Sequence, residues 1–161
     1  MASMRVYLVR HAEATDSLPG AQFVDDLRPL TPRGRRQFLR TARAFARLGD
    51  RLDALRASPT LRTIQTAELL AHQLRCGAFA VLDELHRDIP AAVLQRWLLE
   101  HDPRSIALVG HGRQLRDLAR LLVGSDPPFS LKKGAILRID VRGAVGRPRW
   151  LLREDGRAVA A

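Results

Sequence analysis

The sequence predicts an α/β fold of three layers, in which helices cover both faces of a mostly parallel sheet. Short apolar runs alternate along the chain with helix-length segments whose apolar residues recur every three or four positions. After residue 134 two strand-like runs follow one another without a helix, which predicts an antiparallel C-terminal hairpin at one edge of the sheet. The length of 161 residues and the hydrophobic content of 46% suit one domain over residues 1–161.

The first strand and the first helix are predicted within residues 5–49. Residues 5–10 form the strand, and the polar residues 12–31 form a connection longer than most, which is typical of functional loops. Thr31 is predicted to cap the helix and Pro32 to occupy its first turn. The predicted buried face of this helix consists of Phe38, Ala42, Phe45 and Ala46.

The remaining elements continue the alternation. Further strands are predicted over residues 52–57, 79–82 and 105–110, and the hairpin over residues 135–141 and 149–152. Helices are predicted after Ser58-Pro59, from Pro90 onward, and after residue 111. Their predicted inward faces are Ile64, Ala67, Ala71 and Leu74 in the first, Val93, Leu94, Trp97 and Leu98 in the second, and Leu115, Leu118, Ala119 and Leu122 in the third.

The charge of the chain favours anionic partners. The formal net charge is +10, and of the 27 basic residues only Lys132 and Lys133 are lysine. Arginine binds phosphate through two parallel N–H groups, and the positive field attracts anions in general. Nucleic acid is not predicted as a partner, because aromatic residues make up only 5% of the chain and single-strand binders stack bases on them.

Cysteine usage and the N-terminus indicate a cytoplasmic protein. Cys76 is the only cysteine, so an intramolecular disulfide is impossible and a reducing compartment is favoured. The apolar run near the N-terminus is too short for a signal peptide or a membrane span, and no membrane association is expected.

Polar residues follow two of the predicted strands directly. Arg10 and His11 come after the first strand, and His111 and Gly112 come after the strand at 105–110. The carboxyl ends of parallel strands share one edge of a sheet, where ligands bind in open α/β folds. His111 also begins a helix, whose free N–H groups favour an anion.

Two further residues are predicted to reach the same edge. Arg62 lies in the first turn of its helix, where a positive charge opposes the helix dipole, so its position indicates a ligand. Glu84 follows the strand at 79–82. A metal site is not predicted, because no HxH, HxxxH or Cys/His pair occurs and the arginines would repel a cation. These residues therefore predict a phosphate site without metal or cofactor.

The motifs resemble those of the histidine phosphatase superfamily, which has a phosphoglycerate mutase-like fold. Arg10-His11-Ala12 resembles its RHG signature, with alanine in place of the usual glycine. Three further motifs occur in the family's order: Arg28-Pro29-Leu30-Thr31 with Gly34, Ser58-Pro59-Thr60-Leu61-Arg62 with Gln65-Thr66, and Gly110-His111. The resemblance extends from residue 5 to about residue 140. The short chain without a cap insertion is most similar to the small SixA-type phosphohistidine phosphatases.

The resemblance implies roles for these residues. His11 would be the nucleophile that forms a phosphohistidine intermediate, with its other ring nitrogen held by a backbone carbonyl. Arg10, Arg62, His111 and Gly112 would bind the phosphoryl oxygens. Glu84 is the best candidate for the general acid, and Glu13 and Asp88 are the alternatives.

The predicted function is a metal-independent phosphatase whose substrate is phosphohistidine in a protein. An imidazole leaving group, with a reference pKa of about 6.5, depends less on a general acid than an alkoxide does. The alternative is a small-molecule phosphomonoesterase of the same superfamily. A non-catalytic module that binds phosphate or nucleic acid ranks last, because it would have no use for a histidine nucleophile.

Overall fold

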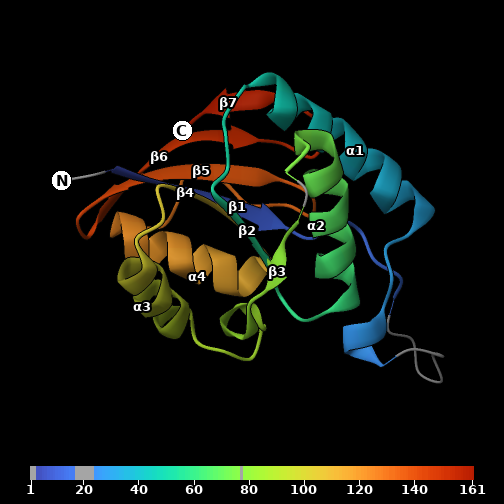
Figure 1. Cartoon of the computed structure of the whole chain (residues 1–161), viewed down its shortest axis with the longest axis horizontal. Coiled ribbons are helices and arrows are strands. Elements are labelled where there is room, and N and C mark those ends of the chain that lie inside the picture. The colour runs from blue at the N-terminus through green and yellow to red at the C-terminus, as the bar shows by residue number, and fades with distance from the viewer. Residues whose placement is uncertain (1–2, 17–23, 77) are drawn as a thin grey trace.

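A computed structural model describes residues 3–16, 24–76 and 78–161, and they form one seven-stranded sheet between two pairs of helices (Figure 1). The strands are β1 (Ser3–Arg10), β2 (Ala54–Ala57), β3 (Ala80–Val81), β4 (Ser105–Gly110), β5 (Ile136–Arg142), β6 (Val145–Leu152) and β7 (Ala158–Ala160). The helices are α1 (Pro32–Arg47), α2 (Leu61–Leu74), α3 (Ala91–His101) and α4 (Gly112–Val123), with short 3-10 helices η1 (Asp25–Leu27) and η2 (Asp83–Leu85).

The sheet has a parallel half and an antiparallel half. Its strand order is β3-β2-β4-β1-β5-β6-β7. The strands from β3 to β1 are parallel, whereas β5, β6 and β7 each run antiparallel to the neighbour before them in this order. In the central pair, Arg10 of β1 lies opposite Gly110 of β4. The prediction of a mostly parallel sheet with an antiparallel C-terminal part is confirmed.

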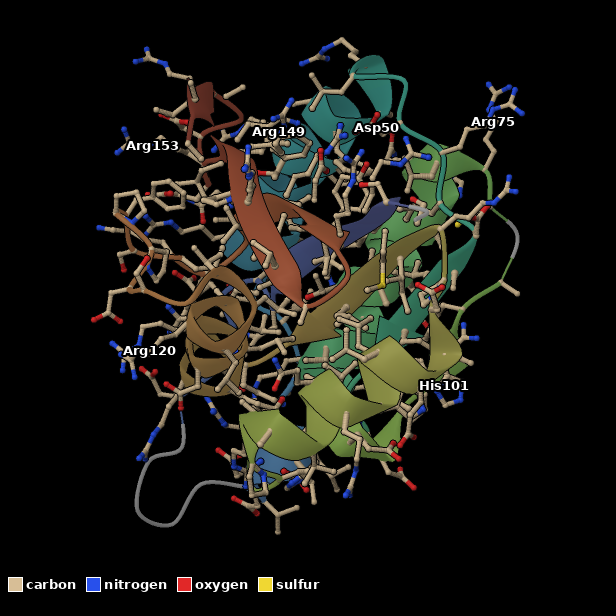
Figure 2. All side chains as sticks on the ribbon, turned by 90° about the vertical axis from the view of Figure 1, so that its left-hand side faces the viewer. Asp50, Arg75, His101, Arg120, Arg149 and Arg153 are labelled. Atoms are coloured by element: carbon tan, nitrogen blue, oxygen red, sulfur yellow. The ribbon has the colours of Figure 1, made fainter. Side chains whose placement is uncertain are left out.

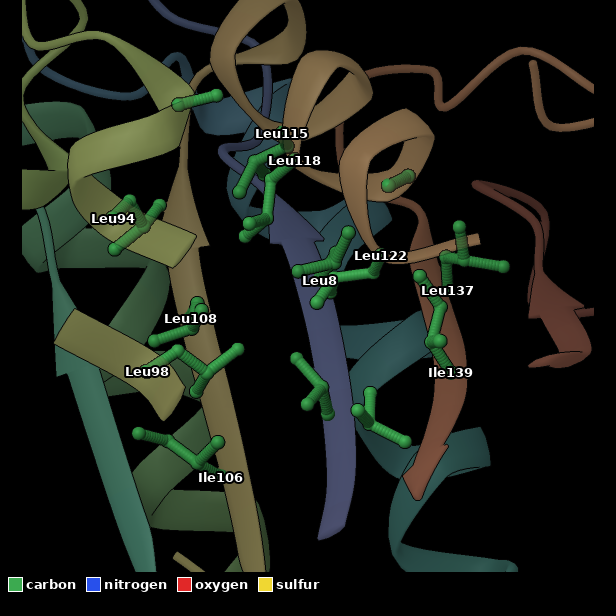
Figure 3. Close-up of a cluster of buried hydrophobic side chains, with 14 of the residues drawn as sticks. Leu8, Leu94, Leu98, Ile106, Leu108, Leu115, Leu118, Leu122, Leu137 and Ile139 are labelled. Carbon is green, nitrogen blue, oxygen red and sulfur yellow. The ribbon is translucent and has the colours of Figure 1, made fainter. Parts of the chain in front are cut away.

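The alternation of side chains along β1 divides the core into two layers. Val6 and Leu8 pack on the side of α3 and α4, whereas Tyr7 and Val9 pack on the side of α1 and α2. Figure 3 shows Leu115, Leu118 and Leu122 of α4 lying over the sheet beside Leu8 and its neighbours on β4 and β5. Helices therefore cover both faces of the sheet, as predicted for three layers.

The first helix begins as predicted. Thr31 Oγ1 accepts a hydrogen bond from the Gly34 backbone N–H at 2.9 Å, and Pro32 is the first helical residue. Gly34 lies so close to the β1–α1 connection that a Cβ there would be 2.2 Å from the Glu13 carbonyl oxygen. Any side chain at position 34 would push the start of α1 away from the connection that begins at His11.

Two strand predictions differ from the structure. The strand predicted at 79–82 contains only Ala80 and Val81, and both are exposed because they pair with β2 alone. The predicted edge hairpin of β5 and β6 is extended by β7, which pairs with β6 and becomes the edge. Three residues with small side chains give too short an apolar run to predict a strand.

The buried face of α2 also differs from the prediction. Ala67 and Ala71 are buried as expected, but Ile64 and Leu74 are only half-buried. The remaining buried residues of the helix are Arg62, Thr63, Thr66 and Leu70. Compared with the predicted face, the buried face of α2 therefore includes the polar residues Arg62, Thr63 and Thr66 near the start of the helix. Among the described residues, no helix is both long and apolar enough to cross a membrane.

Candidate active site

His11 and His111 meet at the carboxyl ends of β1 and β4. The register places Arg10 opposite Gly110, so the two histidines are the next residues on adjacent strands. Their ring centroids are 5.6 Å apart, and the His11 backbone N–H donates to the Gly110 carbonyl at 3.0 Å. Both side chains are buried, with exposed fractions of 7% and 6%. The predicted convergence of the two histidines is therefore present.

The backbone fixes the tautomer of His11. Its Nδ1 lies 2.7 Å from the Ala12 carbonyl oxygen, which can only accept a hydrogen bond. Nδ1 therefore carries the ring proton and Nε2 keeps a lone pair. The Ala12 backbone N–H donates in turn to Thr66 Oγ1 at 3.1 Å. Ala12 is not among the residues with a left-handed φ in the described ranges, so alanine in place of glycine causes no backbone strain here.

His111 has a different partner. Its Nε2 lies 2.9 Å from Oγ of Ser58, a fully buried residue in the turn after β2. A hydroxyl can donate or accept, so this contact suits either tautomer of the ring. The sequence indicated Ser58 as part of a turn and of the motif that ends in Arg62, and it gave no contact with His111. Its position at the start of the segment that leads to Arg62 was the one signal that could have identified it.

Burial keeps both histidines neutral at pH 7. Desolvation lowers the pKa of His11 to about 4, and the positive charges of Arg62 and Arg10 act in the same direction. Desolvation lowers the pKa of His111 to about 3, with further contributions from His11 and Arg62. The lone pair on Nε2 of His11 is therefore available across the physiological range.

Arg62 is a buried arginine in a chain whose arginines mostly reach the surface. Figure 2 shows Arg75, Arg120 and Arg153 extending outward from the ribbon, whereas Arg62 is 3% exposed. Its Nη1 donates to the Asp25 carbonyl at 2.8 Å and its Nη2 to Asp25 Oδ2 at 3.2 Å. Its Nε–H is buried and has no hydrogen-bond partner among the described residues.

Arg10 also has an unpaired Nε–H. Its Nη1 donates to the Leu131 carbonyl at 3.0 Å, and its buried Nε has no partner in the described part of the chain. Gly112 lies directly beside it: a Cβ at that position would be 2.8 Å from the guanidinium carbon and would displace the guanidinium group. Burial lowers the pKa of both Arg10 and Arg62. Because a buried, unpaired cationic N–H is costly, these two groups fit an anion at this edge.

Other polar residues hold the surrounding loops, among them Gln65 and Thr66 of the motif that contains Arg62. Gln65 Oε1 accepts from the Leu30 backbone N–H at 2.8 Å, so α2 fixes both ends of the β1–α1 connection through Gln65 and Thr66. Burial raises the pKa of Asp25, but the charges of Arg62, Arg28 and Arg87 outweigh this and lower it overall. Arg87 also pairs with Asp26, which joins the connection to the segment after η2.

The three candidate general acids lie in different surroundings. Glu84 is half-buried in η2, and its carbonyl accepts from Gln114 Nε2 at 2.8 Å. The Glu13 carboxylate accepts from Thr31 Oγ1 at 2.8 Å. Asp88 is largely exposed, 3.5 Å from Nδ1 of His86. Within the described residues none of these carboxylates is hydrogen-bonded to His11 or His111, and a general-acid role for Glu84 stays a prediction.

The polar side chains at the site are cationic guanidinium groups and neutral imidazoles, and among the described residues they do not form a metal site. Across residues 3–16, 24–76 and 78–161, no group of three or more His, Cys, Asp or Glu side chains could hold a metal ion. Cys76 is half-buried beyond the end of α2, and burial raises the pKa of its thiol. What the edge offers is a neutral imidazole nitrogen beside two guanidinium groups.

Comparisons with known proteins agree with this chemistry. Residues 6–89 match the model of the histidine phosphatase superfamily (branch 1). An uncharacterized protein of Picosynechococcus sp. is 30% identical, over 92% of this chain and 99% of its own length.

Two solved structures have the same fold. The protein histidine phosphatase SixA complexed with tungstate superposes with a TM-score of 0.84 at 22% identity, covering 94% of this chain and 97% of its own. The alpha-ribazole phosphatase of Shigella flexneri gives a TM-score of 0.73 at 21% identity, covering 94% and 97%. The matched family segment contains Arg10, His11 and Arg62, and the chain is a phosphate-bond hydrolase that belongs to the histidine phosphatase superfamily (branch 1).

Proposed function

We propose that this chain removes the phosphoryl group from phosphohistidine in proteins, without a metal, through a phosphohistidine intermediate on its own His11. The observation that carries the proposal is the His11 Nδ1 contact with the Ala12 carbonyl at 2.7 Å, which leaves Nε2 unprotonated. That nitrogen belongs to a buried ring beside two guanidinium groups, and the Nε–H of each has no partner among the residues that the structure describes. A nucleophile and donors for an oxyanion are thus held in one place.

In the first step, the lone pair on Nε2 of His11 attacks phosphorus. The new P–N bond forms as the P–N bond to the substrate imidazole breaks, and the electron pair leaves with that imidazole. Arg10 and Arg62 stabilise the charge spread over the equatorial oxygens, which is the main requirement of phosphoryl transfer. His111 adds a third donor, because the bound anion raises its pKa and Ser58 holds its Nε2.

In the second step, water attacks the phosphorylated His11. The bond between phosphorus and Nε2 breaks, inorganic phosphate is released, and the imidazole returns to its neutral form. Arg10, Arg62 and His111 stabilise both transition states, because the phosphoryl group stays between these donors in both steps. Only the attacking group and the leaving group differ between the two steps. The chain needs no cofactor for either step.

The contacts of the carboxylates support phosphohistidine as the substrate. A protonated phosphohistidine releases a neutral imidazole, whereas a phosphomonoester requires a proton for its alkoxide. The Glu13 carboxylate is bonded to Thr31, and Asp25 and Asp26 are paired with arginines. Asp88 lies 3.5 Å from Nδ1 of His86, and this leaves Glu84, which follows β3 at the same edge of the sheet, as the candidate proton donor among the described residues. A small phosphomonoester is therefore the second candidate substrate, and it depends on Glu84.

The test compares turnover of a phosphohistidine protein with turnover of a panel of small phosphomonoesters, in the presence of EDTA. We expect the phosphohistidine protein to have the higher kcat/KM, and brief exposure to it to leave acid-labile phosphate on His11. Glu84→Gln should slow the phosphomonoesters more than the phosphohistidine protein. Glu68→Gln, an exposed change on α2, is the matched control. Equal or faster turnover of the phosphomonoesters would contradict the proposed substrate.

A further inference from the structure

A cavity of about 260 Å³ lies beside Arg10, and neither His11 nor His111 is among its lining residues. Its lining residues are Arg10, Gly112, Arg113, Arg116, Ser130 and Leu131. Arg10 belongs to both the cavity and the proposed phosphoryl site, and Gly112 is the residue after His111. Because a water molecule occupies about 30 Å³ in the liquid, the cavity has room for one acidic side chain together with water.

The cavity is lined by positive charge without a counter-charge. Arg113 and Arg116 lie in the first turns of α4 and are exposed. Neither forms an ion pair with a carboxylate in the described part of the chain. One turn further along α4, Arg120 is paired with Asp126 at 2.6 Å and Asp117 at 3.7 Å. The arginines that line the cavity are therefore the ones on this helix that stay available to a ligand.

Ser130 and Leu131 also line the cavity, and the segment that contains them is hydrogen-bonded to Arg10. The Leu131 carbonyl accepts from Arg10 Nη1 at 3.0 Å, and the Gly134 backbone N–H donates to the Arg10 carbonyl at 3.0 Å. The segment that contains Ser130 is thus fixed to the end of β1. A group bound in the cavity would lie at a set distance from the phosphoryl group.

We propose that this cavity binds a second anionic group of the substrate, beside the phosphoryl group that is removed. Arg113 and Arg116 are then specificity-determining residues. On a protein substrate the group is the carboxylate of an Asp or Glu that flanks the phosphohistidine, and on a small phosphomonoester it is a carboxylate or second phosphate of the same molecule. This inference rests on the proposed phosphatase activity of His11 and identifies the substrate feature that the site selects.

The experiment uses two matched pairs of substrates. The first pair is a phosphohistidine peptide with Glu beside the phosphohistidine and the same peptide with Gln. The second pair is O-phosphoserine and O-phosphoethanolamine, which differ by one carboxylate. The enzyme is compared with Arg113→Gln/Arg116→Gln, with Arg116→Glu, and with Arg40→Gln, an exposed arginine on α1 outside the cavity.

We expect the wild-type enzyme to favour the anionic member of a pair about twofold to fivefold in kcat/KM, as for a contact with exposed charges. The double variant should lose this preference and still hydrolyse p-nitrophenyl phosphate, which has no second anionic group, at the wild-type rate. Arg116→Glu should reverse the preference, whereas Arg40→Gln should retain it. Added salt should weaken the preference.

Three results would overturn the inference. They are the absence of a charge preference in the wild-type enzyme, a loss in Arg40→Gln as large as in the double variant, and an equal loss on p-nitrophenyl phosphate. Failure of the proposed function gives a different result. If only the small phosphomonoesters are hydrolysed, phosphohistidine is not the substrate and the second pair alone tests the cavity. If the peptides are hydrolysed equally well with Glu and Gln, the function stands and the cavity proposal fails.

Discussion

The ends of β1 and β4 carry the same residue type in nearly the same surroundings but have different hydrogen-bond partners. His11 and His111 are equally buried, at 7% and 6% exposed, and lie on paired strands. The ring of His11 is bonded to a backbone carbonyl, which fixes one tautomer. The ring of His111 is bonded to the hydroxyl of Ser58, which accommodates either.

This difference assigns complementary chemistry to the two rings. A nucleophile needs a lone pair that is always available, and the fixed tautomer of His11 provides it. A donor to the phosphoryl group needs an N–H, and the Ser58 hydroxyl can donate to Nε2 of His111 and leave the ring proton on Nδ1. The two rings share residue type and burial. Their roles therefore differ because His11 is hydrogen-bonded to a backbone carbonyl and His111 to a hydroxyl.

The largest expected effect comes from replacing the nucleophile. His11→Gln should lower kcat on the order of 10⁶-fold, as for other nucleophiles in a built site, and should abolish the acid-labile adduct. His111→Gln should slow turnover but still form the adduct on His11. His72→Gln, an exposed change on α2, is the control. An adduct that survives His11→Gln and disappears in His111→Gln would show that the roles are reversed.

Next in size is the replacement of Arg62. Arg62→Lys keeps the charge but loses the planar array of N–H donors, and we expect kcat/KM to fall about 100-fold to 1000-fold, or ~2.7–4 kcal/mol. Arg28→Lys is the matched change, because Arg28 also pairs with Asp25, at 2.9 Å. It should reduce kcat/KM only a few-fold. Similar losses in both variants would mean that Asp25 and its loop, rather than contact with the phosphoryl group, account for the effect.

Much of the fold was predictable because it depends on local patterns. Buried strands such as β4 are continuous apolar runs, and Thr31-Pro32 begins a helix through its own side chains. Two short strands fit these patterns less well: the strand predicted at 79–82 is reduced to Ala80 and Val81 in β3, and β7 was not predicted. They contain two and three residues, and what makes them strands is a neighbouring strand distant in sequence.

The site was predictable where it depends on topology and unpredictable where it depends on individual contacts. Parallel strands bring their carboxyl ends to one edge, so the histidines after β1 and β4 had to meet. The contact between Ser58 and His111 joins residues 53 positions apart, and that between Asp25 and Arg62 joins residues 37 apart. No periodicity or motif specifies such pairs, because they depend on how a loop packs on a helix.

The burial of both histidines predicts a loss of stability in mild acid. The unfolded chain takes up protons on these residues near pH 6.5, whereas the folded chain resists until about pH 4 for His11 and about pH 3 for His111. Their stabilising contribution is therefore complete above pH 6.5 and is lost as the pH falls through these values. Each histidine should lower the free energy of unfolding by about 1.4 kcal/mol per pH unit between pH 6 and 4.

Urea unfolding at pH 7, 6, 5 and 4 measures this slope. His11→Gln/His111→Gln should have a shallower slope than the wild-type chain, because glutamine does not titrate. Vanadate or phosphate should reduce the acid sensitivity of the wild-type chain, since a bound anion raises the pKa of both rings. An unchanged slope in the double variant would contradict neutral, buried histidines.

The smallest effect is expected at Ser58, where it is also most informative about the difference between the two rings. Ser58→Ala removes the partner of His111 and leaves the backbone carbonyl that holds His11 in place. A neutral hydrogen bond contributes about 0.5–1.5 kcal/mol, so kcat should fall about threefold to tenfold with little change in KM. Formation of the adduct on His11 should remain.

Thr60→Val provides the comparison within the same turn. Thr60 Oγ1 is hydrogen-bonded to Thr63 Oγ1 at 2.6 Å, whereas the ring of His111 is hydrogen-bonded to Ser58, so removal of the Thr60 hydroxyl should lower the thermal midpoint and leave kcat near the wild-type value. Ser58→Ala should show the opposite balance, with a larger effect on kcat than on stability. If both variants lose kcat and stability in the same proportion, Ser58 only supports the turn. His111 would then need no positioning partner, and the distinction between the two rings would depend on the backbone contact of His11 alone.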